Sequence, residues 1–399
     1  MARKVESKSD WGLIVKLIIG IVVGIIIGLI AASRESTGTM QVVGSIQHIC
    51  GQLIFFAVPL VVLAFIGPAI IRLGSNANKM LVVGVVLAYL SSVGAACFAY
   101  VGGVALFPIL QIPMEAAEPL RALPDIIFKF NIPALMSVMT ALVTALLFGV
   151  AIVWSKSKTL ETIWNEFEQC ILYIVQHVVI PILPVFIAAT FANLSYEGLI
   201  TDQLPVFGKI IVVAIIGHFI WMAVLYLIAG AISKRNPWEV VRYYGPAYLT
   251  AVGTMSSAAT LPVSLECARR SPVLSRETVD FMIPLGATVH LCGSVLTETL
   301  FILVISQLLY GAIPPFSTMV LFIILFGFFA VGAPGVPGGT VMASLGIVIS
   351  VLGFDAAGTA LLIAIFAIQD SFGTACNVTS DGALALMIEG IFGKKKRTA

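Results

Sequence analysis

The sequence predicts an all-α membrane protein with eight transmembrane helices and two re-entrant helical hairpins. Of its 399 residues, 59% are hydrophobic and 11% are charged, and the mean hydropathy is +1.07. Apolar runs long enough to cross a bilayer recur along the chain. After residue 233, clusters of glycine, proline and polar residues interrupt the apolar sequence.

This composition excludes whole classes of protein. A soluble domain is about 45–50% apolar and about 25% charged, so this chain lacks the polar surface that a water-facing globule needs, and a soluble enzyme is excluded. The formal net charge of +2 gives no basic surface for nucleic acid. Six scattered cysteines indicate packing residues rather than disulfides or a metal site. The lipid bilayer is therefore the expected partner, and no cofactor is expected.

Six apolar stretches precede residue 233, and each is long enough for a transmembrane helix, which needs about 20 mostly apolar residues. The first is too long for a signal-peptide core, so we interpret it as a retained helix. Several exceed the bilayer thickness, which predicts tilt or kinks. The stretches cover residues 11–32, 44–72, 79–108, 131–155, 164–194 and 205–232.

Lysine and arginine residues mark one side of the membrane. They precede the first stretch, follow the second, fourth and sixth, and recur at the carboxyl terminus. Because basic loops remain in the cytoplasm, we expect a multi-pass protein of the cell (inner or plasma) membrane with both termini cytoplasmic and an even number of crossings. These residues are Arg3, Lys4, Lys8, Arg72, Lys79, Lys156, Lys158, Lys234, Arg235 and Lys394–Arg397.

Two clusters of helix-breaking residues fall inside the apolar sequence that follows residue 233. Residues 332–339 contain four glycines and two prolines, which no continuous helix tolerates. Residues 254–262 have a similar character with less glycine. A hairpin of two half-helices would bury such backbone in protein and leave its amides and carbonyls free for a ligand; a short extracellular loop is the alternative. Two crossings and two hairpins satisfy the even count, which gives eight spans.

The last span has a narrow polar face. Asp370, Thr374, Asn377 and Asp381 fall within about 60° of one another at 100° per residue. Because a carboxylate in hydrocarbon costs at least about 2.5 kcal/mol, we expect this face to meet an ion or a substrate. A helix that merely lines a hydrated crevice is the alternative.

The preceding span has a second polar face, formed by His290, Ser294, Thr297 and Glu298. Gly286 and Gly293 bracket a stretch that is expected to unwind, so that its carbonyls could reach a cation. Glu298 is a candidate proton carrier, because a buried carboxyl group can exist in its neutral form. His290 is a weaker candidate, since a single membrane histidine is as often satisfied by a neighbouring carbonyl.

Four motifs in this order resemble those of the dicarboxylate/amino acid:cation symporter family, which includes archaeal aspartate transporters, mammalian excitatory amino acid transporters and neutral amino acid exchangers. Each motif alone is weak, but four in order are specific, and the expected spans cover residues 11 to 392. The motifs are SSAATLP at Ser256–Pro262, PLGAT at Pro284–Thr288, GVPG at Gly335–Gly338, and Asp370 with NVTSD at Asn377–Asp381.

The resemblance implies a homotrimer with the glutamate-transporter fold and an elevator mechanism. Residues 1–232 would comprise spans 1–6, with spans 1, 2, 4 and 5 as the scaffold and spans 3 and 6 flanking the transport domain. Residues 233–399 would form the transport core, in the order hairpin 1, span 7, hairpin 2, span 8.

The resemblance also implies site residues. Asp370 would hold the α-ammonium group of an amino acid, and Asn377 its α-carboxylate, while the tip of the second hairpin would act as the gate. Asp381, with the carbonyls of Gly286 and Asn377, would hold one sodium ion, and Thr288 would contribute to a second with carbonyls near residues 330–333. The implied substrate-binding residues are Ser256, Ser257, Val336, Gly338, Asp370, Gly373, Thr374 and Asn377; the implied cation-binding residues are Gly286, Thr288, His290, Asn377 and Asp381.

Three departures from the family pattern bear on specificity. Gly373 and Met255 occupy the two positions where relatives of this family place an arginine. Without a guanidinium group, a second substrate carboxylate would be buried unpaired, which favours a small neutral amino acid. Cys292 replaces an aspartate that binds sodium, and a thiol is a poor ligand for a hard cation. Glu298 stands where the excitatory members have a protonatable glutamate, so coupling to H+, Na+ or both is expected.

Other functions remain as alternatives to a symporter or exchanger of small neutral amino acids. The first is an acidic amino acid or C4-dicarboxylate symporter of the same family. A channel is more distant, since two hairpins favour alternating access. An intramembrane protease would need its two aspartates facing each other, whereas Asp370 and Asp381 lie about 16 Å apart on one helix. No enzymatic activity is therefore expected.

Overall fold

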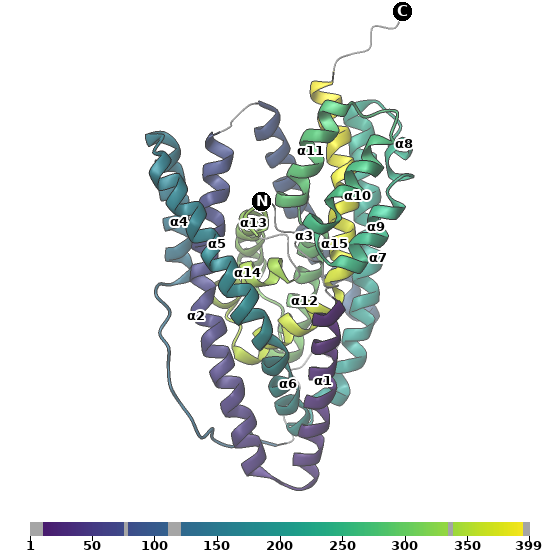
Figure 1. The fold of residues 1–399 in the computed structure, drawn as a ribbon. Coiled ribbons are helices and arrows are strands. Elements are labelled where there is room, and N and C mark those ends of the chain that lie inside the picture. The colour runs from purple at the N-terminus through teal and green to yellow at the C-terminus, as the bar shows by residue number, and fades with distance from the viewer. Residues whose placement is uncertain (1–10, 76–78, 111–120, 334–337, 394–399) are drawn as a thin grey trace, which may run out of the picture.

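The computed structural model describes residues 11–75, 79–110, 121–333 and 338–393, and within these ranges the chain is helical and contains no strand (Figure 1). Eight helical stretches of the described chain are long and apolar enough to cross a membrane, which agrees with the predicted number of spans. They are α1 (Trp11–Ser33), α2 (Thr37–Ser75), α3 (Lys79–Leu110), α4 (Val138–Ser155), the continuous α5 (Lys158–Ile174), η1 (Val175–Val179) and α6 (Ile180–Tyr196), α7 (Ile200–Ser233), the broken α11 (Arg276–Val289) and α12 (Cys292–Tyr310), and α15 (Ala356–Phe392).

The fifth span contains a π-helical turn, η1, which lies directly before Pro181. Proline lacks a backbone N–H and its ring crowds the carbonyl one turn earlier. A wider turn accommodates both effects without ending the helix. The π-helical turn in this long span therefore has a local cause in the sequence.

The fourth span begins later than predicted, at Val138 rather than at residue 131. Residues 131–137 form no helix, because Pro133 follows Ile132 and the backbone N–H of Ile132 donates to Oε1 of Gln52 on α2 at 2.8 Å. The Ser137 hydroxyl then accepts from the N–H of Thr140 and starts the helix. Pro133 and one hydrogen bond from a neighbouring span therefore accompany a helix start later than hydrophobicity alone had predicted.

A stripe of glycines lets α1 approach α6 closely (Figure 1). Gly20, Gly24 and Gly28 recur every fourth residue and therefore share one face of α1. An added Cβ at Gly20 would lie 2.7 Å from the carbonyl oxygen of Pro184 on α6. Small residues of this kind allow backbones to pack closely in membranes, where packing replaces the hydrophobic driving force.

Between the spans of the second half lie two pairs of helices that are each shorter than a membrane crossing. The first pair follows the four-residue helix α8 (Trp238–Val241) and comprises α9 (Gly245–Thr254) and α10 (Ser257–Arg269). The second comprises α13 (Phe316–Gly332) and α14 (Gly339–Leu352). These pairs fall where the breaker clusters were found, and their helices have between 10 and 17 residues, fewer than the about 20 that a span needs.

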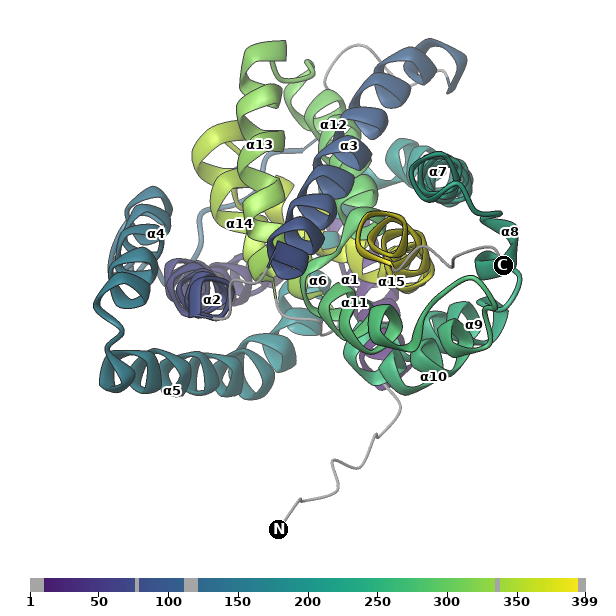
Figure 2. The ribbon, with the colours of Figure 1, turned by 90° about the horizontal axis from the view of Figure 1, so that it is seen from above.

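One group of helices surrounds the last span, and a second group lies on the opposite side of the molecule (Figure 2). Helix α15 packs against α7, α9, α11 and α12, and α3 packs against α12 and α13. Helix α2 packs against α4, α5 and α6 on the other side of the molecule. The buried polar residues of α15 consequently lie inside the first group, surrounded by the breaks in the second half of the chain.

Candidate functional site

The polar face predicted for the last span is buried in the protein. Asp370, Thr374, Asn377 and Asp381 on α15 are between 1% and 4% exposed. Three of them contact a discontinuity in another helix, where backbone groups are free of helical bonds. The site is therefore made of one unbroken helix that faces two interruptions, the break between α11 and α12 and the start of α14.

Asp370 contacts the second short helix pair. Its Oδ2 accepts a hydrogen bond of 2.8 Å from the backbone N–H of Gly338, the residue that precedes α14. Gly338 has a φ of +71°, in the left-handed region that favours glycine. Val336, also expected at this tip, lies outside the described residues, as does Gly335. The contact places a carboxylate at the amino-terminal end of α14.

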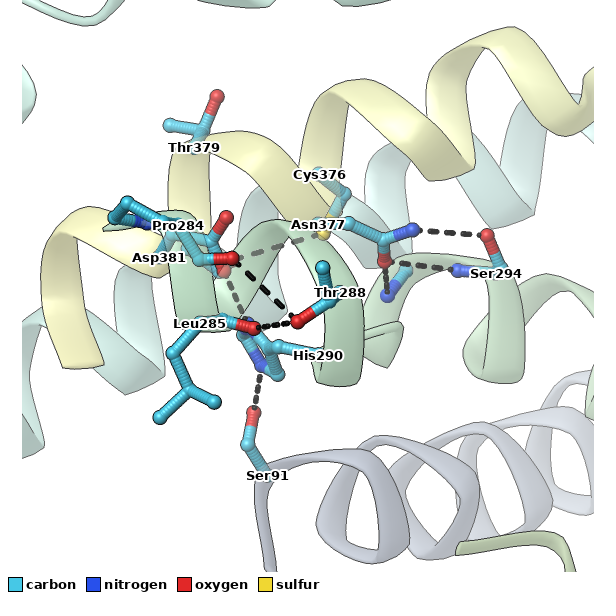
Figure 3. Close-up of polar contacts among 12 residues, drawn as sticks. Ser91, Pro284, Leu285, Thr288, His290, Ser294, Cys376, Asn377, Thr379 and Asp381 are labelled. Carbon is cyan, nitrogen blue, oxygen red and sulfur yellow. Dashed lines mark hydrogen bonds and ion pairs between the residues drawn. The ribbon is translucent and has the colours of Figure 1, made fainter. Parts of the chain in front are cut away.

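Asn377 is held by the first turn of α12. Its Oδ1 accepts from the N–H of Gly293 at 2.7 Å and from that of Ser294 at 3.3 Å, and its Nδ2 donates to the Ser294 hydroxyl at 3.0 Å. Helix amino termini leave such N–H groups without intrahelical partners. The amide expected to hold a substrate carboxylate is thus oriented by span 7 in this structure (Figure 3).

Asp381 contacts the break itself. His290 lies between α11 and α12, and its Nδ1 is 2.9 Å from Oδ1 of Asp381. On the opposite edge of the ring, Nε2 is 2.8 Å from the hydroxyl of Ser91 on α3 (Figure 3). The carboxylate of Asp381 also lies against Gly286, in the space that a Cβ would fill. His290, Gly286 and Asp381, predicted as cation-binding residues, are therefore brought together.

The first short helix pair turns at a strained residue. Met255 has a φ of +51° and ends α9, and the Ser256 hydroxyl then caps α10 by accepting from the N–H of Ala259 at 3.2 Å. Ser257, at the start of α10, is 3% exposed. Met255 and Gly338 line one narrow cavity, so the turns of the two short helix pairs lie near each other.

Thr288 lies apart from the buried stripe, in a cavity of about 460 Å³. Its hydroxyl donates to the carbonyl of Leu285 at 2.7 Å and is exposed. Gly332 and Ala333, at the end of α13, line the same cavity. The structure therefore brings together the residues that the resemblance implied for a second sodium ion, away from Asp381.

Glu298 lies on α12 and is fully buried. Its Oε1 accepts a hydrogen bond from the hydroxyl of Ser344 on α14. Its Oε2 has no hydrogen-bond partner among the described residues. A buried carboxyl oxygen without a partner is costly as part of an anion, so the position suits a group that can carry a proton.

Gly373 faces the first turn of α12 beside the same stripe. A Cβ at this position would lie 3.3 Å from the Cα, N and Oγ of Ser294, which leaves room for a small side chain only if Ser294 moves slightly. Thr374 follows it and is buried. Both residues lie about one helical turn after Asp370 on α15.

Two polar partners in this region were not predicted. Ser91 and Ser344 contact His290 and Glu298 from helices that the sequence analysis treated as apolar. A third buried polar group, His218 on α7, places its Nε2 3.1 Å from the carbonyl of Gly293 and 2.9 Å from the Thr297 hydroxyl. Isolated serines and histidines inside apolar spans were the available signal, but nothing in one sequence says which of them meet.

Comparisons with known proteins agree with this architecture. The model of the sodium:dicarboxylate symporter family matches residues 13–391. Excitatory amino acid transporter 1 of Ambystoma tigrinum is 26% identical over 70% of this chain and 52% of its own length. The neutral amino acid transporter B(0) of Homo sapiens is 26% identical over 64% of this chain and 47% of its own length.

The chain spans about half the length of the curated relatives it matches. The family model, in contrast, covers nearly all of the spans and both short helix pairs. The matched range of this chain contains the four motifs and the polar residues of α15. This chain belongs to the sodium:dicarboxylate symporter family.

Proposed function

We propose that the protein is a cation-coupled symporter or exchanger of small neutral amino acids. The observation that carries this proposal is the position of Asp370, a 3% exposed carboxylate whose Oδ2 accepts from the N–H of Gly338 at 2.8 Å. A buried carboxylate favours a cationic partner, and an α-ammonium group supplies one. Gly373 and Met255 stand at the arginine positions, which supports a neutral side chain on the substrate.

Around that ammonium group, the other polar residues have complementary roles. Asn377 and the amides at the start of α10, near Ser256 and Ser257, would bind the α-carboxylate. Thr374 and Gly373 would line the pocket for the side chain, and the segment with Val336 and Gly338 would close over it. Names of relatives that include a neutral amino acid transporter support this assignment.

Two groups would couple transport to a cation. The cavity with Thr288 and Ala333 offers hydroxyl and carbonyl oxygens, the ligands that a hard cation prefers. Glu298, with its unpartnered Oε2, would carry a proton. If uptake does not respond to a pH gradient but depends steeply on the sodium concentration, transport is not coupled to a proton.

Movement would follow the grouping of the helices. Residues 233–399, with α3 and α7 flanking them, would move as the transport domain against a scaffold that contains α1, α2, and α4 to α6. The two short helix pairs would enter the membrane as re-entrant hairpins. We place the protein in the cell membrane as a homotrimer with both termini in the cytoplasm.

The direct test is Asp370→Asn, which keeps the shape of the side chain and removes its charge. Breaking a buried ion pair costs about 3–5 kcal/mol, so the affinity for an amino acid should fall by about two to four orders of magnitude. Calorimetry on purified protein in detergent measures this, and Asp125→Asn, at an exposed loop carboxylate, is the matched control. Unchanged affinity in Asp370→Asn would show that the ammonium group binds elsewhere.

The second candidate substrate is an acidic amino acid or C4-dicarboxylate, which the family's name favours. A screen of thermal stability against both classes of compound separates the two. A C4-dicarboxylate carries no ammonium group, so its binding should not weaken in Asp370→Asn. Stabilisation by dicarboxylates that survives this substitution would select the second candidate.

A further inference from the structure

His290 occupies an unusual place for a histidine in a membrane protein. It is 0% exposed and lies in the two-residue break between α11 and α12. Its backbone N–H donates to the carbonyl of Gly286 at 2.9 Å, which ends α11. Its ring therefore projects from a fixed backbone position rather than from a mobile loop.

Both edges of the His290 ring are engaged by other helices. Nδ1 is 2.9 Å from Oδ1 of Asp381 on α15, and Nε2 is 2.8 Å from the Ser91 hydroxyl on α3 (Figure 3). A carboxylate and a hydroxyl oxygen can both accept hydrogen bonds. The ring can therefore present two N–H groups at once and place a positive charge beside Asp381.

Asp381 needs such a partner. It is 1% exposed on a membrane-spanning helix, and a carboxylate there is costly unless a cation or donors compensate it. A sodium ion would require oxygen ligands around it, whereas the group that faces Oδ1 is a ring nitrogen. The same oxygen, Oδ1, is also the Asp381 atom that lies nearest to the space a Cβ of Gly286 would fill. The imidazole and the Gly286 backbone thus fill the space beside Oδ1 that an ion bound to this oxygen would need.

We infer that His290 is the built-in counter-group of Asp381, so that Asp381 binds no coupling sodium ion in this protein. The inference takes from the proposed function only that a coupling cation is bound somewhere. It revises the sodium site that the resemblance implied for Asp381, Gly286 and Asn377. Any sodium dependence then belongs to the separate cavity that contains Thr288.

The test is a sodium titration of the full-length purified protein without substrate, read as the midpoint of thermal unfolding. Sodium chloride is compared with equimolar choline chloride. Thr288→Val removes the exposed hydroxyl of the other candidate site, and this variant should show no sodium-specific stabilisation. Thr250→Val is the matched control, because the Thr250 hydroxyl also donates to a backbone carbonyl one helical turn earlier.

A second variant tests the role of the ring directly. His290→Asn supplies a smaller side chain with an amide oxygen, so Thr288→Val/His290→Asn should gain a saturable sodium-specific rise of at least about 1 °C in the midpoint, as ligand linkage requires. Adding Asp381→Asn should abolish the gain. The inference is wrong if Thr288→Val alone keeps a sodium-specific shift that Asp381→Asn removes.

The readout separates this inference from the proposed function. Because no substrate is present, the sodium titration does not depend on which compound the protein carries. Failure of every amino acid to bind would overturn the proposed function and leave the role of His290 intact. Sodium binding at Asp381 would overturn the inference and leave amino acid transport intact.

Discussion

Gly373 offers the sharpest test of substrate selection, through Gly373→Arg. The residue lies three positions after Asp370 on α15 and faces the first turn of α12. A guanidinium group there could bind a substrate carboxylate in the bidentate geometry that arginine favours. The variant should therefore bind an acidic amino acid better and a neutral one worse.

The expected changes in substrate preference and in stability of Gly373→Arg can both be estimated. A hydrogen bond to a charged group contributes about 1.5–3 kcal/mol, which raises the preference for aspartate over a neutral amino acid by about 10- to 100-fold. The new Cβ would lie 3.3 Å from the backbone of Ser294. Ser294 must shift by a few tenths of an ångström, and such overpacking costs about 1–3 kcal/mol of stability.

Gly373→Ala separates the two effects, because it adds the Cβ without the guanidinium group. Competition binding with aspartate and alanine, read by calorimetry, gives the selectivity of each variant, and thermal unfolding gives the cost. Both variants should lose stability, and only the arginine variant should change selectivity. If Gly373→Arg unfolds at the same temperature as Gly373→Ala and has the same selectivity, Gly373 does not face the substrate side chain.

Two further predictions concern stability. Gly20→Ala should lower the midpoint of thermal unfolding, because its Cβ would lie 2.7 Å from a backbone carbonyl of α6. Gly102→Ala is the control and should leave the midpoint unchanged, since nothing lies within 4 Å of a Cβ there. Equal midpoints for the two variants would show that the glycine stripe does not set the spacing of α1 and α6. Outside the spans, burial together with repulsion from Asp355 raises the pKa of Glu197 from 4.5 to about 7. The folded protein therefore binds this proton more tightly than the unfolded chain, and the stability gained is complete below about pH 4.5 and lost as the pH rises through about 7. When the free energy of unfolding is measured across this pH range, Glu197→Gln should become more stable relative to the wild type as the pH rises. Parallel curves of unfolding free energy against pH would contradict the raised pKa of Glu197.

Much of the site could be predicted because membrane burial makes polar residues conspicuous. Asp370, Asn377 and Asp381 stood out on an apolar span, and their helical spacing placed them on one face, as α15 shows. The breaker clusters likewise indicated where helices end, since glycine and proline act locally. At residues 131–137, Pro133 is a local signal against a helix, but the contact of Gln52 on another helix with the backbone of Ile132 could not be predicted.

The partners of these residues required the folded chain. The sequence predicts that His290 and Asp381 lie in apolar spans, but the distance of 2.9 Å between Nδ1 and Oδ1 depends on how α15 packs against the break in span 7. Ser91 joins them from a helix that lies almost two hundred residues earlier in the chain. The sequence by itself determined the spans, the helix breaks and the polar face, because hydrophobicity, backbone propensity and helical periodicity are local. Only the tertiary structure decided which group compensates each buried charge, because that depends on contacts between helices distant in the chain.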